Sequence, residues 1–328
     1  MRGLASRAQL LLAVRSLLGP RIVAALEDET VTDVLLLHSL EVLACRNGRY
    51  EVIGRLTESE AESLVRLLAT LIGKPLDGAH PEAHGYLAEL SQRVQLVTAP
   101  RASTPVLAFR RGASRVPTLA EYVAQGRASP EQLRVLTHAF ERRATVLVAG
   151  ATGAGKTTFV RACLREPVFM ARRIVVLEDT PELHLDRVGH PNWTALFAER
   201  VNAELIRVAL RLNPDCLLPG EIRDGTAAQA ALLAWGSGHP GGLSTVHGNS
   251  AEDALHQLAA YLEPVTQALP LRQIARAVQL VVFLEARNGA PRLSTVAEVK
   301  SLDAHGEFVL AHERLDDSAS VPSEEKTP

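Results

Sequence analysis

The sequence is poor in cysteine and in aromatic residues, and it carries no excess charge of either sign. Its three cysteines, Cys45, Cys163 and Cys216, lie far apart among 328 residues, which is typical of a reducing compartment and not of a disulfide scaffold. Lysine and arginine total 35 against 37 acidic residues, so no global basic field indicates a dedicated nucleic-acid binder. No apolar run reaches the length of a membrane-spanning helix. We therefore expect a soluble, cytoplasmic protein without sequence-specific nucleic-acid binding.

The N-terminal stretch has the apolar character of a targeting peptide but not its layout. Its apolar run is short, Arg15 interrupts it, and no small-residue cleavage site follows. Apolar residues instead recur at helical spacing, at Leu10, Leu11, Val14, Leu17 and Leu18. The pattern predicts an amphipathic helix, with peripheral association with a membrane surface as the alternative use of its apolar face.

The chain is long enough for two domains with separate cores. Residues 1–114 combine strand patterns such as "DVLLL" and "TPVLAFRR" with helical ones, which predicts a small α+β domain behind the N-terminal helix. Residues 115–312 are assigned to a second domain. Residues 313–328 are polar, and we expect them to be disordered.

The second domain alternates strand and helix patterns. Ser129, Pro130 and Gln132 supply an N-cap, a first helical residue and a capping box for its first long helix. Buried-strand patterns follow at "TVLVAG", "RIVVLED", "DCLLPGE", "LSTVH" and "QLVVFLE". This alternation predicts an α/β fold with a largely parallel sheet.

The strongest chemical signal is a phosphate-binding loop. An apolar strand leads into the pattern G-x-x-x-x-G-K-[ST], and a helix leaves it. Glycines let backbone N–H groups point at an anion, the helix N-terminus adds a positive dipole end, and the motif's lysine reaches the β- and γ-phosphates while its threonine binds Mg²⁺. The predicted nucleotide site comprises Gly150, Ala151, Thr152, Gly153, Ala154, Gly155, Lys156, Thr157 and Thr158.

Hydrolysis also needs carboxylates near the terminal phosphate. Glu178 and Glu182 follow one apolar strand, and Glu221 follows another. Ligands of open α/β sheets gather at the carboxyl ends of the strands, so we expect these groups to converge there. Glu221 and Thr157 are the predicted metal ligands, and all three glutamates are candidates for positioning the attacking water.

Two histidines flank the strand pattern "LSTVH" in a glycine-rich stretch. His247 ends the strand, where an imidazole could sense the γ-phosphate, and we include it among the catalytic candidates. The preceding glycines are expected to let the loop move between nucleotide states. His239 lies farther back, beside Pro240, and a place at a subunit boundary is the alternative for it.

Four motifs occur in one order: "GATGAGKTT", "LEDTPEL", "LRLNPDCLLPGEIRD" and "GHPGGLSTVHGNS". They match the Walker A, Asp, Walker B and His boxes of the secretion superfamily of traffic ATPases, which the chain therefore resembles. "AWGSGHPGG" and "RAVQLVVFLE" are most similar to the TrbB-type conjugal transfer ATPases of type IV secretion, with Tad-pilus ATPases as the nearest alternative. The resemblance is strong over residues 150–250 and weak over the N-terminal third.

The resemblance implies a hexameric ATPase at the cytoplasmic face of the inner membrane. Its subunit would pair a PAS-like N-terminal domain with a RecA-like P-loop domain, bind ATP and Mg²⁺, and work with inner-membrane secretion or conjugation components. Arginines of the N-terminal domain or of a neighbouring subunit would reach the nucleotide. By this resemblance "FRR" offers Arg110, with Arg93 and Arg101 as weaker candidates, while Arg211 and Arg223 match positions near Walker B.

Two departures from the family pattern leave other functions open. Pro219 lacks the N–H of a strand residue, so the strand must end or bulge there, which could displace Glu221. Gly248 stands where the family usually has alanine and is expected to loosen the turn after His247. Pro219 and the irregular N-terminal third make a nucleotide-binding assembly scaffold with negligible hydrolysis the second hypothesis. A small-molecule kinase is disfavoured because no lid or acceptor signature follows the boxes.

Overall fold

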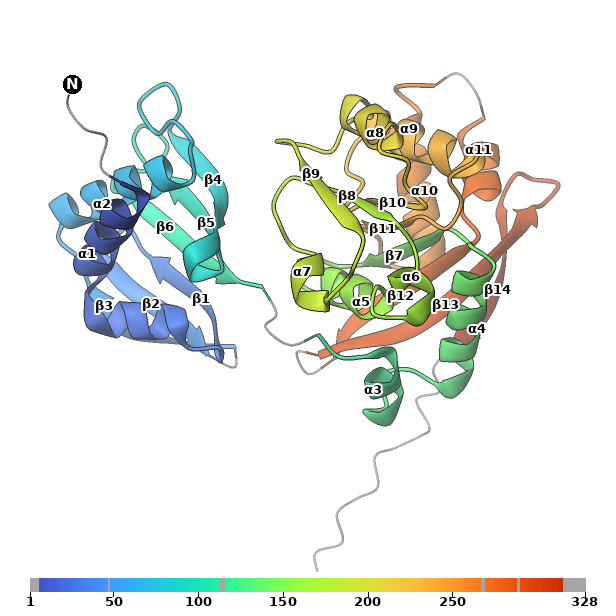
Figure 1. Ribbon diagram of the computed structural model, residues 1–328, viewed down its shortest axis with the longest axis horizontal. Coiled ribbons are helices and arrows are strands. Elements are labelled where there is room, and N and C mark those ends of the chain that lie inside the picture. Colours follow the sequence, from blue (N-terminus) through green and yellow to red (C-terminus); the bar gives the residue numbers. More distant parts are fainter. Residues whose placement is uncertain (1–5, 47, 113–115, 267–268, 288–289, 315–328) are drawn as a thin grey trace, which may run out of the picture. The chain divides into compact units, whose positions relative to one another are not determined.

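The computed structural model describes residues 6–46, 48–112, 116–266, 269–287 and 290–314 (Figure 1). The chain forms two compact units, Met1–Ser114 and Arg115–Pro328, and each is described by itself. The last strand continues to Arg314, so the tail predicted from residue 313 starts later than expected. Its remaining residues, 315–328, lie outside the described part of the chain.

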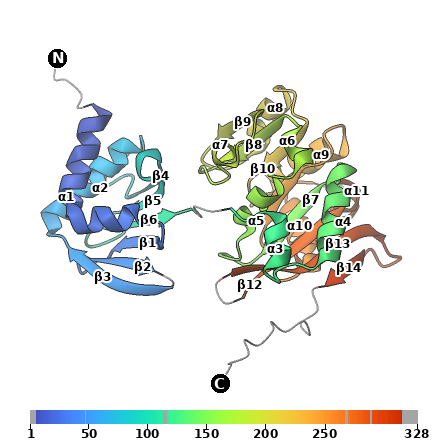
Figure 2. The ribbon, with the colours of Figure 1, turned by 60° about the horizontal axis from the view of Figure 1, so that its bottom comes forward.

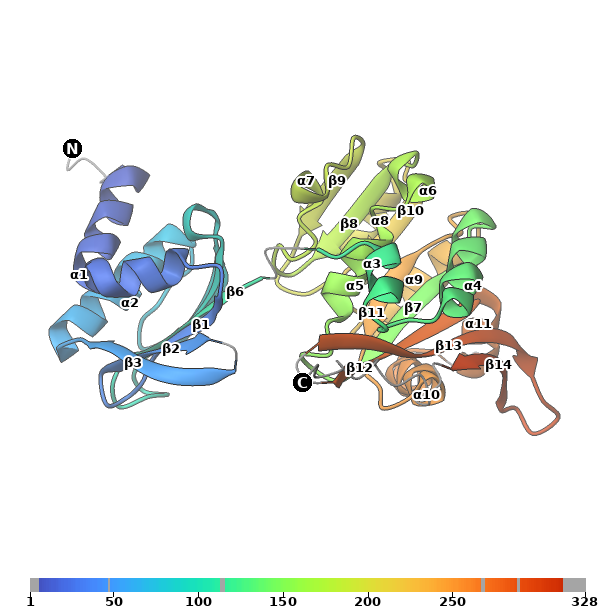
Figure 3. The ribbon, with the colours of Figure 1, turned by 90° about the horizontal axis from the view of Figure 1, so that it is seen from below.

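The first unit is a six-stranded antiparallel sheet in the order β3-β2-β1-β6-β5-β4. Its helices α1 and α2 pack on one face of the sheet around a single apolar core (Figure 3). The α2 N-terminus has a capping box between Thr57 and Glu60. The elements are α1 (Arg7–Glu27), β1 (Val31–Leu36), β2 (Glu41–Arg46), β3 (Arg49–Arg55), α2 (Glu58–Leu71), β4 (Glu82–Leu87), a 3₁₀ turn η1 (Ala88–Leu90), β5 (Gln92–Val97) and β6 (Val106–Arg111).

Helix α1 corrects the expectation that no segment is long enough to span a membrane. By length and composition alone this 21-residue helix passes that test, because an 18-residue window within it has a mean hydropathy of 1.4. The helix is kinked, however, because Gly19 is non-helical (φ 70°, ψ 167°) and Pro20 follows it. Val14, Leu18 and Ile22 are buried in the core of the unit, so the predicted helix forms and these apolar residues pack on the protein's own sheet.

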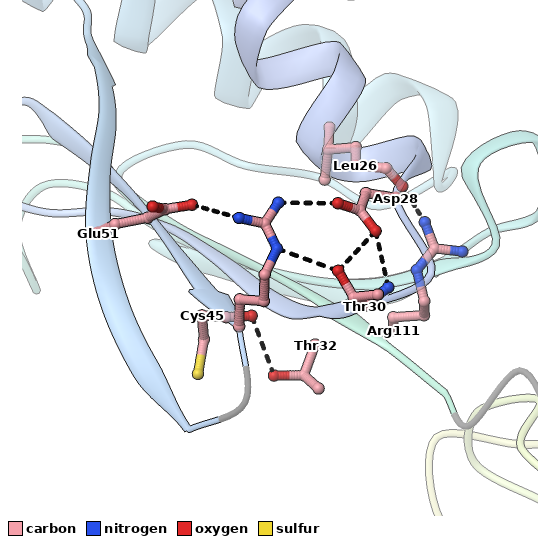
Figure 4. A network of polar contacts seen from close by, with 8 residues as sticks. Leu26, Asp28, Thr30, Thr32, Cys45, Glu51 and Arg111 are labelled. Atoms are coloured by element: carbon pink, nitrogen blue, oxygen red, sulfur yellow. Dashed lines mark hydrogen bonds and ion pairs between the residues drawn. The ribbon is translucent and has the colours of Figure 1, made fainter.

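A polar network fixes the end of α1 to the neighbouring strands (Figure 4). Arg46 on β2 lies 2.8 Å from Asp28, which caps α1, and 2.7 Å from Glu51 on β3. Hydrogen bonds from the hydroxyl and backbone of Thr30, followed by the one from Arg46, lower the pKa of Asp28 to about 2. The network therefore joins three elements through one guanidinium.

The second unit contains a three-stranded sheet, β10-β8-β9, and a five-stranded sheet, β11-β7-β12-β13-β14. A parallel bridge between Glu221 and Thr245 connects them beside β10 and β11. The strands are β7 (Val146–Gly150), β8 (Ile174–Glu178), β9 (Trp193–Phe197), β10 (Cys216–Pro219), β11 (Leu243–Val246), β12 (Leu280–Arg287), β13 (Ala290–Leu302) and β14 (Phe308–Arg314). The helices are α3 (Leu119–Ala124), α4 (Pro130–Glu141), α5 (Lys156–Cys163), α6 (Pro167–Met170), α7 (Leu185–Val188), α8 (Ala203–Leu210), α9 (Gly225–Gly236), α10 (Ala251–Leu262) and α11 (Pro270–Ala277).

Helices cover both faces of this sheet (Figure 2). Along β7, Val146 and Val148 enter the core shared with α3 to α6, whereas Leu147 and Ala149 enter the core shared with α8 to α11. A strand buried on both faces reads as a continuous apolar run, which is why "TVLVAG" shows no alternation. The α/β fold and its largely parallel sheet are confirmed, since among the described strands of this unit only the pairings of β13 with β12 and with β14 are antiparallel.

Candidate functional site

The site is built on the carboxyl edge of the parallel strands. β7 ends at Gly150, β8 ends at Glu178, and β10 and β11 are followed by Glu221 and His247. Because β8 runs parallel to β10 and β11 runs parallel to β7, these four residues reach the same edge. The sheet topology therefore brings together groups from four separate motifs.

The loop after β7 has the conformation that its glycines require. Gly150 and Gly155 have φ of 152° and 86°, and a Cβ at Gly150 would lie 2.6 Å from the carbonyl oxygen of Leu284. Lys156 opens α5, and its Nζ donates to the carbonyl oxygens of Gly150 (2.8 Å) and Ala151 (3.0 Å). The ammonium thus lies folded back under the loop, at the position where phosphates would enter.

The ammonium group of Lys156 is largely shielded from solvent. The residue is 9% exposed, and burial lowers its pKa, whereas the charges of Glu221 and Glu182 oppose that shift and Arg223 adds to it. Both carboxylates therefore act electrostatically on this ammonium. An incoming anion would relieve the burial effect by supplying a closer negative partner.

Glu178 at the end of β8 and Glu182 in the loop after it make different contacts. Glu182 accepts a hydrogen bond of 2.9 Å from the hydroxyl of Thr157, so it meets the predicted metal ligand directly. Glu178 is 6% exposed, and its Oε1 accepts the backbone N–H groups of Glu182 (2.9 Å) and Leu183 (3.0 Å). Burial raises the pKa of Glu178 to about 7. Glu178 therefore holds the loop that carries Glu182, and its carboxyl is poised to change charge near neutral pH.

Glu221 lies at the centre of a charged cluster. Its Oε2 accepts a hydrogen bond of 2.5 Å from Arg223, whose other guanidinium nitrogen lies 2.8 Å from Asp179. The Nε2 of His247 lies 2.8 Å from Oε1 of Glu221. The charge of Glu221 also opposes the lowering of the Lys156 pKa, so one carboxylate contacts His247 after β11 and acts electrostatically on the ammonium at the start of α5.

Neither departure from the family pattern disturbs this cluster. β10 ends at Pro219 as expected, but Glu221 is not displaced, because its bridge to Thr245 continues the sheet. Gly248 does not loosen its turn: a Cβ there would lie 2.9 Å from the backbone of Ala254 on α10. The glycine therefore permits close packing of the residue after His247 against a helix.

His239, the other histidine of the glycine-rich stretch, precedes β11, whereas His247 follows it. The backbone N–H of His239 donates to the carbonyl oxygen of Ala234 at the end of α9, before the strand begins. In the same stretch a Cβ on Gly242 would lie 1.9 Å from Nε1 of Trp235. The two histidines, His239 and His247, therefore do not enclose one ligand, and at Gly242 close packing accounts for the glycine.

Arg211, which the sequence predicts to bind nucleotide, does not lie with the other candidate residues at the carboxyl edge of the sheet. It follows α8 as an exposed residue and leads into Cys216, the first residue of β10. Glu221 follows the opposite end of that strand. Within one chain Arg211 is thus at the amino edge of the sheet, while Arg223 is at the carboxyl edge as predicted from its motif. A role of Arg211 at a neighbouring subunit stays a prediction.

In the N-terminal unit the register separates the two arginines of "FRR". Arg110 pairs in register with Asp33 and with Arg93, and its Nε lies 3.8 Å from Oδ1 of Asp33 while the side chain is 61% exposed. The guanidinium of Arg111 points the other way and donates to the carbonyl oxygen of Leu26 (Figure 4). Arg110 is therefore the more accessible of the two, and its contact with nucleotide stays a prediction.

Strand β12 adds a part of the site that the sequence reasoning missed. A pocket of about 510 Å³ opens beside the phosphate loop. Its lining is Ala151, Thr152, Ala154, Gly248, Asn249, Phe283, Leu284, Glu285, Ala286 and Arg292. The pattern "QLVVFLE" could have indicated this part of the site, because a further parallel strand has its carboxyl end at the same edge of the sheet as β7.

Comparisons with known proteins agree with this geometry. Residues 85–289 match the sequence model of the family described as type II/IV secretion system protein. The conjugal transfer protein TrbB of Rhizobium radiobacter is 32% identical over 305 residues, which cover 92% of this chain and 93% of that protein. The type IV secretion system protein VirB11 of Brucella suis biovar 1 is 28% identical over 295 residues, covering 78% of this chain and 80% of that protein.

Solved structures support the fold. The Legionella pneumophila ATPase DotB aligns with a TM-score of 0.60 at 18% identity, covering 94% of this chain and 80% of that one. The pilus retraction motor PilT with bound ADP aligns with a TM-score of 0.56 at 19% identity, covering 86% and 78%. At such identities the likeness establishes the α/β architecture alone.

Proposed function

The chain belongs to the type II/IV secretion system protein family, and we propose on this premise that it is a hexameric ATPase of type IV secretion or conjugal transfer. It would couple Mg-ATP hydrolysis to pilus assembly or substrate transport. The similarity to TrbB over nearly the whole of both chains favours the conjugal branch over a Tad-pilus or type II secretion ATPase. It would work at the cytoplasmic face of the inner membrane beside other secretion components.

One observation carries the proposal: His247 contacts the carboxylate of Glu221 (2.8 Å) at the carboxyl edge of the sheet, the same edge where the loop after β7 leads into Lys156. In the proposed complex the N–H groups of residues 150–158 and the ammonium of Lys156 bind the phosphates. His247 then donates to the γ-phosphate, and Glu221 accepts a proton from the attacking water. Arg223 orients Glu221 through the hydrogen bond already described.

The donor set at Thr157 suits Mg²⁺. The hydroxyl of Thr157 lies 2.9 Å from a carboxylate oxygen of Glu182, and Glu221 adds a further carboxylate at the same edge. Oxygen donors of this kind are those that Mg²⁺ prefers, and Thr157 with Glu221 would hold it, directly or through water. Bound there, the ion would neutralise charge on the β- and γ-phosphates.

In a ring of identical subunits, a neighbouring subunit can supply an arginine to the nucleotide. A closed ring requires a head-to-tail interface, so a subunit can supply a guanidinium to its neighbour's nucleotide. Arg110, exposed on the N-terminal sheet, is the residue we assign to that role, and Arg211 is assigned to the interface between subunits.

Release of inorganic phosphate by the purified, assembled chain tests the proposal. Wild type should hydrolyse ATP only with Mg²⁺, and Lys156→Ala should lower the rate by on the order of 100-fold or more, because a buried charge on the phosphates is lost. Lys300→Ala is the matched control, since Lys300 is an exposed lysine of the same unit that pairs with Glu298. Equal rates for wild type and Lys156→Ala would contradict the proposal.

The same assay separates hydrolysis from the scaffold alternative. Glu221→Gln should bind a fluorescent ATP analogue as wild type does, yet release phosphate at least about 10-fold more slowly, because the amide cannot accept the proton of water. One of the two reasons for the scaffold hypothesis was that Pro219 could displace Glu221, and Glu221 forms a parallel bridge with Thr245. A wild type that turns over no faster than Glu221→Gln would restore the scaffold hypothesis.

A further inference from the structure

Three metal-ligating side chains converge away from the nucleotide site. Glu252 and His256 lie on α10, and Glu307 lies in the turn between β13 and β14. One ligand atom from each of the three lies within 4.8 Å of the others. The cluster therefore joins a helix to a hairpin about fifty residues further along the sequence.

The spacing of the ligand atoms fits a metal better than a direct hydrogen bond. Glu252 and His256 are four residues apart, which places them on one face of the helix. The Nε2 of His256 lies 3.5 Å from Oε2 of Glu307, at the outer limit for a hydrogen bond. Two ligands that each lie ~2.1 Å from a tetrahedral ion are about 3.4 Å apart. The histidine and the glutamate thus already have the separation of ligands that share one ion.

Within the described part of the chain, the ion pairs of the two carboxylates include no lysine or arginine that would explain their approach. Among the ion pairs of the described residues, neither Glu252 nor Glu307 contacts a lysine or an arginine. The nearby cations Lys300 and Arg142 pair with Glu298 instead. Two acidic groups gathered on one imidazole therefore leave a negative site, which a divalent ion would neutralise.

The local structure holds two of the three ligands in place. The ring of His256 meets the ring of Phe308 edge to face, with centroids 5.5 Å apart. Asp303 accepts the backbone N–H groups of His305 and Glu307, each at 2.8 Å, and so fixes the turn that presents Glu307. Support of this kind behind the ligands is what positions them for a metal.

We propose that Glu252, His256 and Glu307 bind a divalent transition-metal ion of the zinc class, with water completing the coordination. An imidazole with two carboxylates suits Zn²⁺, Co²⁺ or Ni²⁺, whereas Mg²⁺ prefers oxygen donors alone. The ion connects α10, which follows the His247 loop, to the β13–β14 hairpin. This site stabilises the second unit and is independent of the nucleotide chemistry.

Isothermal titration of the tag-free full chain with ZnCl₂, after chelator treatment and without nucleotide, tests the site. We expect one saturable Zn²⁺ site per chain, no comparable heat from MgCl₂, and a higher melting temperature with Zn²⁺. His256→Gln and Glu307→Gln should each weaken Zn²⁺ binding by at least about 10- to 100-fold, because each removes a direct ligand. His305→Ala is the matched control: His305 is an exposed histidine of the same turn outside the cluster.

Melting curves recorded in chelator verify that the two glutamine variants are folded, and both side chains are exposed enough for that to be expected. Phosphate release with Mg-ATP should be unchanged in all three variants, which separates this site from the proposed ATPase function. Zn²⁺ binding that survives in both His256→Gln and Glu307→Gln overturns the proposal. So does the lack of a saturable site in wild type, or equal loss in His305→Ala.

Discussion

The buried carboxyl of Glu178 makes the stability of the second unit depend on pH. Its pKa is raised from 4.5 to about 7, chiefly because burial disfavours the charged form, while the two backbone N–H groups that it accepts oppose the shift. In the unfolded chain the carboxyl has its ordinary value. The folded state therefore binds the proton more tightly, and the stability from this group is fully present below about pH 4.5 and is lost as pH rises through 7.

The size of the effect follows from the shift. A change from 4.5 to about 7 is roughly 2.5 units, which at about 1.4 kcal/mol per unit gives on the order of 3 kcal/mol. Glu178→Gln should abolish this dependence, because the amide stays neutral and its Oε1 can still accept the N–H groups of Glu182 and Leu183. The variant should be within about 1 kcal/mol of wild type at pH 5 and exceed its stability by about 3 kcal/mol at pH 8.

Urea unfolding at pH 5, 6, 7 and 8, followed by tryptophan fluorescence, measures the difference. Both tryptophans, Trp193 and Trp235, belong to the second unit, so the signal reports the unit that contains Glu178. Glu204→Gln, on an exposed position of α8, is the control and should remain near wild type throughout. If the free-energy difference between Glu178→Gln and wild type is the same at pH 5 and pH 8, the assignment of a buried, proton-binding Glu178 is refuted.

Two further substitutions test the packing and the charge cluster of the site. Gly248→Ala should destabilise the unit by about 1–3 kcal/mol, because the new Cβ would lie 2.9 Å from the backbone of Ala254. Gly236→Ala is the control and should change stability by less than about 1 kcal/mol, because its Cβ would meet nothing within 4 Å. Equal melting temperatures of the two variants would contradict this prediction. Arg223→Gln removes the hydrogen bonds to Glu221 and Asp179 and should lower the rate of phosphate release at least about 10-fold. It should change the free energy of unfolding by less than about 1 kcal/mol, because the side chain of Arg223 is 54% exposed. An undiminished kcat would show that Arg223 does not position Glu221.

Much of the candidate site could be predicted because it depends on local motifs and one rule of topology. The loop from Gly150 to Lys156 is specified by its own residues, since a strand, glycines and a helix start suffice to form it. Glu178, Glu221 and His247 each follow an apolar run. Parallel strands place their carboxyl ends at one edge, so the convergence of these groups needed no knowledge of distances.

What could not be predicted depends on contacts between distant segments. The position of Arg211 required knowing which edge of the sheet the α8–β10 connection occupies, because a motif neighbour can lie a full strand length from the site. The choice between Arg110 and Arg111 depended on strand register, which reverses the face with each residue. The tight packing at Gly248 depends on α10, and no pattern around the glycine announces that contact.

The groups assigned to the nucleotide all have partners within the chain. Lys156 donates to two carbonyl oxygens of its own loop, the hydroxyl of Thr157 donates to Glu182, and Arg223 is hydrogen-bonded to Glu221. Binding of a triphosphate therefore exchanges these bonds for others. Moving Thr157 and Arg223 to the ligand would remove one hydrogen bond each from Glu182 and Glu221 beside phosphate oxygens of the same charge, which is unfavourable unless a cation joins them. The arrangement thus couples nucleotide affinity to the divalent ion, because each ligand removes the repulsion that opposes the other.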